Sequence, residues 1–109
     1  MEAQKVELKD EELDQVVGGF SEENHIGKYD GVVGQTYYFV YDDDHSAWCR
    51  AVLTKTYEKT KWIFFSERWH NVHILEYTSA FVDVVRSSFK IDFNYSLNSS
   101  FWTMYTSKK

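Results

Sequence analysis

Aromatic side chains constrain the fold of this chain more than any other feature. The sequence holds four Trp, eight Tyr and eight Phe residues, and all of them follow Gly19. Residues 36–41, with the sequence TYYFVY, consist almost entirely of residue types that favour strands. Residues 89–95 alternate apolar with polar side chains, which is the period of a half-buried strand. The part of the chain after Gly19 is therefore predicted to fold as β-structure.

Short apolar runs separated by polar turns continue to the end of the sequence. The strands expected from these runs are residues 36–41, 47–57, 62–65, 72–77, 80–85, 89–95 and 101–105. Polar turns are expected at residues 42–46 and 59–61. Many short strands at even spacing indicate a mainly β fold, as a small antiparallel sandwich or a barrel-like domain over residues 35–109.

Residues 71–86 have a second interpretation. Ile74, Tyr77, Phe81 and Val84 nearly fit the apolar stripe of a helix. The β-branched and aromatic content of the segment favours strands. Both alternatives remain open at this level, and strands are the prediction.

The first nineteen residues have a different character from the rest. They carry six acids and two bases, no aromatic residue, and two glycines at the end, whereas residues 20–109 have a net charge of −1. Leu8, Leu13 and Val16 fall on one face of a helix, and Gly18 and Gly19 would end that helix. A helix this short is marginal in water. The segment is thus expected to be mostly disordered or helical, and to fold against a receptor groove.

This segment resembles the double-glycine leader peptides of bacteriocin-type exported precursors from bacteria. The recognition positions of that family fall here on Leu8, Glu12, Leu13 and Val16, and its cleavage site falls on Gly18 and Gly19. One departure is Lys5, which stands where the family usually has an apolar residue. The resemblance covers residues 1–19 only.

The resemblance implies a partner and a destination. The partner is an ABC exporter with a papain-like cysteine peptidase domain, which cuts after the second glycine. The precursor is then cytoplasmic and the mature part is secreted. Residues 20–34, with glycines at 27, 31 and 34, are predicted to be a flexible linker between the cleavage site and the first strand.

Composition excludes several other classes of function. The near-neutral residues 20–109 lack the basic footprint of a nucleic-acid-binding protein. No apolar run reaches the length of a transmembrane segment. Cys49 is the only cysteine, so no disulfide within the chain is possible, and it is predicted to be a small buried hydrophobe.

Candidate residues for catalysis or metal binding are few. His70 and His73 are three residues apart, but on a strand they would point to opposite faces, so they are predicted to be surface or sheet-edge histidines. Residues 42–44 are three aspartates without the spacing of a calcium loop, and they are predicted to form a solvated turn. No catalytic residue, no metal site and no cofactor is expected.

These observations predict binding without catalysis. The mature part is expected to be a bacteriocin-like or effector polypeptide that binds an extracellular target. The alternative is a secreted or surface-associated binding module for glycans or host proteins. A third hypothesis is a small hydrolase centred on His70 and His73. Tryptophan is favoured at binding hot spots. The candidate binding residues are Trp48, Trp62, Trp69 and Trp102.

Overall fold

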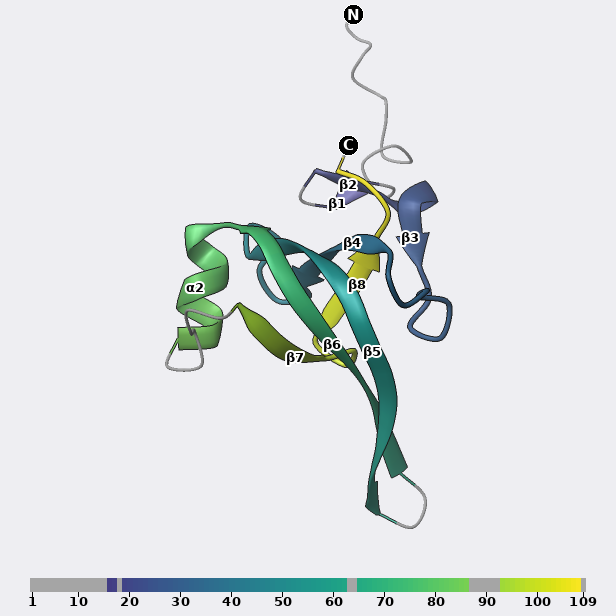
Figure 1. Cartoon of the computed structure of the whole chain (residues 1–109). Coiled ribbons are helices and arrows are strands. Elements are labelled where there is room, and N and C mark those ends of the chain that lie inside the picture. The colour runs from purple at the N-terminus through teal and green to yellow at the C-terminus, as the bar shows by residue number, and fades with distance from the viewer. Residues whose placement is uncertain (1–15, 18, 63–64, 87–92, 109) are drawn as a thin grey trace, which may run out of the picture.

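The computed structural model of this chain describes residues 16–17, 19–62, 65–86 and 93–108. Figure 1 shows the elements along the chain. In order they are β1 (Val16–Val17), β2 (Phe20–Ser21), a 3-10 turn (Glu22–Asn24), β3 (His25–Ile26), β4 (Thr36–Tyr41), β5 (Trp48–Trp62), β6 (Phe65–Tyr77), α2 (Ser79–Val85), β7 (Asn94–Asn98) and β8 (Trp102–Tyr105).

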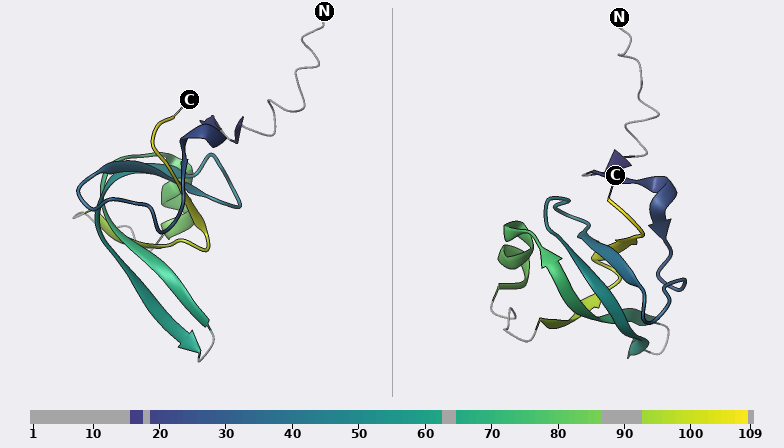
Figure 2. Two further views of the ribbon diagram at one scale, coloured as in Figure 1. Left: turned by 90° about the vertical axis from the view of Figure 1, so that its right-hand side faces the viewer. Right: turned by 45° about the horizontal axis from the view of Figure 1, so that its top comes forward.

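Six of the strands form one antiparallel sheet in the order β3-β8-β4-β5-β6-β7, and β1 pairs with β2 in a separate hairpin. The predicted mainly β, antiparallel fold is confirmed. The two views of Figure 2 show how strongly the large sheet curves. The domain is therefore one curled sheet rather than two stacked sheets.

The long hairpin of β5 and β6 produces much of this curvature. Along β5, Cys49, Ala51 and Leu53 are fully buried, while the residues between them are partly exposed. The register between the two strands shifts at Arg50/Ala51 and again at Leu53/Lys55. Such bulges bend a strand and increase its twist. They let the first half of the hairpin wrap around the core.

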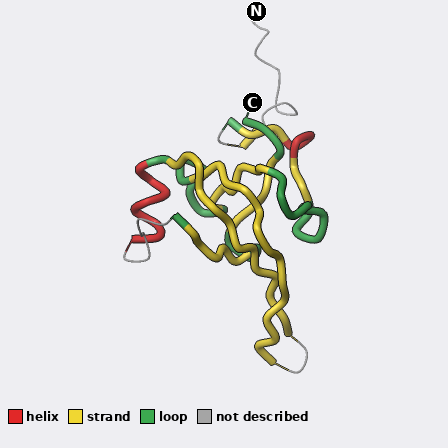
Figure 3. The backbone as a smooth tube through the Cα atoms, viewed as in Figure 1, coloured by secondary structure: helices red, strands yellow, loops and turns green. Residues whose placement is uncertain are grey.

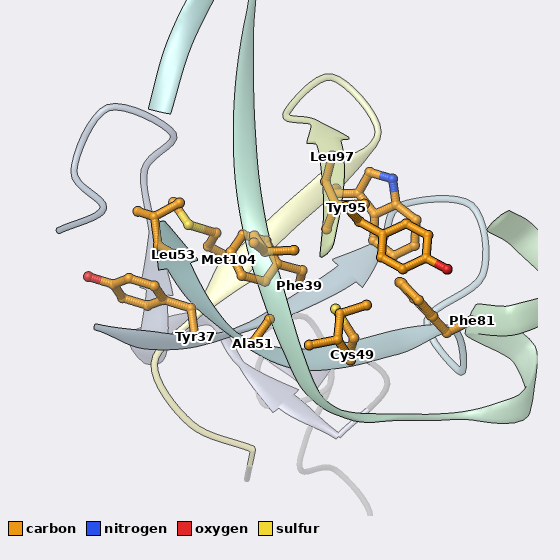
Figure 4. Close-up of a cluster of buried hydrophobic side chains, with 12 residues drawn as sticks. Tyr37, Phe39, Cys49, Ala51, Leu53, Phe81, Tyr95, Leu97 and Met104 are labelled. Atoms are coloured by element: carbon orange, nitrogen blue, oxygen red, sulfur yellow. The ribbon is translucent and has the colours of Figure 1, made fainter. Parts of the chain in front are cut away.

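The core lies inside the curl. β7 and β8 are separated by three strands in the sheet, yet side chains from both of them enter the same buried cluster. Phe81 of α2 joins them, because its ring centroid lies 6.1 Å from that of Tyr95 on β7 and 5.3 Å from that of Trp102 on β8. Figure 4 shows Phe81 and Tyr95 at one end of the cluster, with Leu53 and Met104 toward the other end. The helix therefore fills one end of the curled sheet.

Residues 71–86, which fit either a strand or a helix by sequence, contain the end of a strand and a helix. Residues 71–77 belong to β6, as predicted, but the predicted strand 80–85 is wrong because these residues lie in α2. Thr78 caps the helix: its Oγ1 accepts a hydrogen bond from the Phe81 amide at 3.2 Å and donates one to the Ser46 carbonyl at 2.8 Å. An N-cap of this kind satisfies an amide that the first helical turn leaves free. Capping and the burial of Phe81 thus outweigh the strand propensity of the valines.

Two further boundaries differ from the predictions. The expected turn at 59–61 is wrong, because β5 continues to Trp62 and pairs there with Phe65. In the expected strand 89–95, residues 89–92 lie outside the described residues, and β7 begins at Asn94. Cross-strand pairing along the whole of β5 and β6 overrides the local turn signal of the lysines and threonine.

The predicted flexible linker is wrong for residues 20–26, which pack on the domain. Phe20 is fully buried in a second cluster with Val40 and Tyr105, on the opposite face of the sheet from the main core. Strand β3 then pairs with β8 through His25 and Ile26. Burial of one large aromatic side chain stabilises a domain by a few kcal/mol, about 2–3. Phe20 is the first residue after the expected cleavage site.

The rest of that segment also contacts the sheet. A Cβ on Gly31 would lie 2.9 Å from Leu53 Cδ2, so the loop approaches the core too closely for a larger residue. The amide of Gly34 donates to the Leu53 carbonyl at 2.8 Å. Residues 31 and 34 are therefore docking points of a packed loop.

The leader prediction falls mostly outside the described residues, which exclude residues 1–15 and Gly18. Of the described residues in this segment, Val16 and Val17 form a two-residue strand, where a helix end was expected, and they pair with Ser21 and Phe20. Gly19 lies between the two strands with φ of +89°, a conformation that favours glycine. The anchoring of Phe20 positions β2 as the partner for this strand.

Candidate functional site

The hairpin of β5 and β6 extends beyond the rest of the sheet. β4 pairs with β5 only as far as Val52, and β7 pairs with β6 only from Trp69 onward. Residues 55–62 and 65–68 therefore extend beyond both neighbouring strands. Together with Trp69 at their base, they form a two-stranded extension that we call the arm. Figures 1 and 3 show the arm projecting from the body of the domain. An element with so few neighbours in its own domain is available to a partner.

The tip of the arm carries two exposed aromatic side chains. Trp62 and Phe65 are directly paired across the hairpin, and they are 74% and 57% exposed. Single exposed apolar residues are ordinary, but paired large aromatics on a projecting tip are typical of a contact surface. The tip is therefore the strongest candidate for a binding anchor in the described part of the chain.

Cations and aromatic rings alternate along one face of the arm. Tyr57 and Trp69 form a cross-strand pair. Lys59 Nζ lies 4.6 Å from the centroid of the Trp69 ring, and Lys55 Nζ lies 5.4 Å from that of Tyr57. Trp69 Nε1 also donates to Glu67 at 3.2 Å. These contacts hold Trp69 half-buried, so it supports the arm more than it exposes a contact surface.

Arg68 lies on the other face of the arm, where it contacts an aromatic ring and a carboxylate. The Arg68 guanidinium lies 4.9 Å from the ring centroid of Tyr29, and its Nη1 lies 3.7 Å from a carboxylate oxygen of Glu58. By sequence, residues 55–69 contain four bases and two acids, although residues 20–109 as a whole have a slight negative charge. The arm thus concentrates positive charge next to exposed aromatic surface.

The four predicted tryptophans do not form one face. Trp102 is only 7% exposed and belongs to the core, which makes the prediction of an exposed anchor wrong for this residue. Trp48 packs on Phe20 with a centroid separation of 5.9 Å, at the opposite end of β5 from the tip of the arm. Only Trp62 and Trp69 lie on the arm, and Phe65 joins them. Alternation alone missed Phe65 because the hairpin tip was expected at residues 59–61.

The two histidines of interest lie on opposite faces of β6, as predicted. The prediction of surface positions holds for His73, which is exposed with Nδ1 2.9 Å from Asn94 Oδ1. It is wrong for His70, which is 1% exposed. Burial, and next the nearby Arg68 charge, lower the pKa of His70 from 6.5 to about 4. His70 is therefore neutral at pH 7.

The remaining candidates have structural roles. Cys49 is fully buried, as predicted, and burial raises the pKa of its thiol, which disfavours the reactive thiolate. Asp44 accepts hydrogen bonds from the Ser46 hydroxyl at 2.6 Å and amide at 3.1 Å, which lower the pKa of its carboxyl and form the expected turn. Within the described residues, no group of three or more His, Cys, Asp or Glu side chains is arranged to hold a metal ion.

The chain matches no protein-family model, no curated protein and no solved structure. The described segments also contain no helix that is long and apolar enough to cross a bilayer. The candidate sites therefore stand on their own geometry.

The buried His70 predicts a specific acid sensitivity. Because the unfolded chain binds a proton near pH 6.5 and the folded chain resists it until about pH 4, stability is lost as the pH falls through this window. The expected loss is on the order of 3 kcal/mol. Urea unfolding at pH 7, 6, 5 and 4 measures it.

The matched variants are His70→Gln and His73→Gln. His70→Gln lowers stability at pH 7 but should flatten its decline toward pH 4, whereas His73→Gln keeps the wild-type decline because His73 is exposed. An unchanged decline in His70→Gln would assign the acid sensitivity to other groups.

Proposed function

We propose that this protein is an exported precursor that is cut after Gly19, and that its mature domain binds an extracellular target through the arm. The observation that supports binding most directly is the exposed Trp62 and Phe65 pair on a projecting, locally basic hairpin. In this proposal the mature protein is a bacteriocin-like or effector polypeptide that acts by contact.

The leader resemblance supports the export part of the proposal. Leu8, Leu13 and Val16 supply the apolar anchors, Glu12 supplies the acidic position, and Gly18 and Gly19 supply a backbone that a narrow protease cleft accepts. The abrupt change in charge and aromatic content at Gly19 coincides with the cleavage site. A peptidase-containing ABC exporter is the partner that fits this arrangement.

The packing of Phe20 adds an order of events. A peptidase binds its substrate as an extended chain. In the folded domain, however, Phe20 is fully buried, Val17 pairs with Phe20, and Gly19 has φ of +89°. The bond between Gly19 and Phe20 is thus held in a hairpin beside a buried anchor. Cleavage is therefore expected from the unfolded precursor, with folding completed afterwards.

The export proposal is tested in cells that carry a cognate exporter. Leu13→Ala should abolish release because an anchor is lost, and Gly18→Ala should abolish it because a Cβ blocks the cleft. Mass spectrometry of the culture medium should find a wild-type product that begins at Phe20. Lys9→Ala is the control, because Lys9 is outside the recognition positions. A medium that contains only the uncut wild-type chain contradicts this part of the proposal.

The order of cleavage and folding is tested with purified peptidase domain and pre-folded precursor. Phe81→Ala removes a core side chain on the opposite face of the sheet from Phe20, so it populates the unfolded state without touching the cleavage site. Cleavage should then be faster by about tenfold or more, in proportion to the unfolded population. Val33→Ala, an exposed position, should leave the rate unchanged. Equal rates for wild type and Phe81→Ala would mean that the folded domain is itself a substrate.

The arm is tested by truncating its tip. Trp62→Ala and Phe65→Ala should each reduce target binding or extracellular activity by about tenfold or more, as expected of central hot spots. Because both side chains are exposed, the free energy of unfolding should change by less than about 0.5 kcal/mol. Phe101→Ala, which removes an aromatic that is 52% exposed in the turn between β7 and β8, is the control.

The same variants separate the target classes. Binding to a glycan array that is lost in Trp62→Ala would identify the glycan-binding alternative, and inhibition of bacterial growth that is lost in the same variant would identify the bacteriocin-like activity. Retention of every activity in both tip variants would contradict a role for the arm.

A further inference from the structure

A cavity of about 240 Å³ lies between β3, β8 and the turn that connects β7 to β8. Its apolar wall includes Ile26, Trp102 and Met104, and its polar wall includes Lys28, His70 and Ser99. A dry cavity of about 150 Å³ already accommodates benzene. This cavity is therefore large enough for one ring and a polar substituent.

Two residues that line the cavity carry unpaired polar atoms, and a third such residue lies beside them. Among the described residues, the buried side-chain polar atoms without a hydrogen-bond partner are Arg68 Nε, His70 Nε2 and Ser99 Oγ. These residues are neighbours: Arg68 and His70 lie two apart on β6, and the Ser99 amide donates to the Arg68 carbonyl at 2.9 Å. Native proteins pair nearly all such groups, so an orphan cluster beside a cavity needs an explanation.

The orphan groups can donate hydrogen bonds. Thr56 Oγ1 lies 3.2 Å from His70 Nδ1, so a Thr56 hydroxyl that donates to Nδ1 leaves Nε2 as the protonated nitrogen of the neutral ring. The Ser99 hydroxyl can donate as well. Lys28 is an exposed residue of the lining, and its Nζ lies 5.5 Å from the ring centroid of Tyr29, from where the flexible side chain can turn to the cavity.

The charge of the lining specifies the ligand. None of the described lining residues carries a carboxylate, and the ion pair of Arg68 Nη1 with Glu58 is long, at 3.7 Å. A lining that combines donors and a cation with apolar side chains complements a molecule with an anionic head and a hydrophobic body.

We propose that this cavity binds a small organic acid, with its carboxylate held by His70, Ser99 and Lys28 and its apolar body against Ile26, Trp102 and Met104. His70 Nε2 and Ser99 Oγ, which the protein itself leaves unpaired, are closed to solvent, so the ligand reaches them by displacing the side chains that cover them. The binding is independent of the leader and of the arm, so it is tested separately from export and target binding.

The experiment titrates the full-length protein with benzoate at pH 7 and follows it by 1H–15N NMR. We expect saturable shifts of residues that line the cavity, with a Kd of about 1 mM or tighter. Benzamide, a neutral molecule of the same shape, should bind at least about tenfold more weakly because it lacks the charge. Absence of saturable shifts, or equal binding of benzamide, would overturn the proposal.

The variants Ser99→Ala and Lys28→Met test the polar wall. Each should raise the benzoate Kd by about tenfold, because each removes one donor to the carboxylate. Lys55→Met is the control, since Lys55 lies on the arm outside the cavity. Neither test variant alters the main core, so both are expected to fold. Unchanged affinity in Ser99→Ala and Lys28→Met would show that benzoate binds elsewhere.

Discussion

The contact of Phe81 with Trp102 and Tyr95 is the interaction on which the curled sheet depends. β7 and β8 do not pair with each other, so no ladder of hydrogen bonds closes the sheet between them. A ring from α2 lies in contact with both strands instead. A small domain without a disulfide must obtain its stability from buried area, and aromatic side chains supply the most area per residue. This explains why the main cluster contains so many aromatic residues.

β8 links the two faces of the sheet. Trp102 and Met104 point into the curl, while Tyr105 packs with Phe20 on the outer face. The outer cluster is where the proposed cleavage site meets the folded domain. Because Phe20 can reach its buried position only when the sheet exists, folding and access to the scissile bond oppose one another. In the processing that we propose, export and cleavage would precede folding, and the folded domain would then keep Phe20 docked.

The arm and the cavity, which are the two surface features with proposed functions, do not contribute to the packing of the main core. The β5–β6 hairpin continues past its neighbouring strands, which leaves Trp62 and Phe65 without intramolecular burial. The cavity beside β8 holds polar atoms that the protein does not pair. Arg68 lies at the junction of the two regions: it stacks on Tyr29 and pairs weakly with Glu58, while its Nε remains unpaired.

The amino-acid sequence by itself determined the strand-rich class of the fold, the opposite directions of His70 and His73, and the buried character of Cys49, because periodicity and residue type are local properties. It also suggested the leader, whose described part shows only Val16 and Val17 as a strand. The tertiary structure alone decided that residues 80–85 are helical, that Phe20 is an anchor, and that Trp102 lies in the core while Trp62 lies at a tip. Each of these outcomes depends on partners distant in the chain: Thr78 reaches Ser46, Phe20 reaches Tyr105, and Trp102 reaches Phe81. The spacing of residues along a strand indicates two faces, but only the curvature of the sheet determines which face encloses the core.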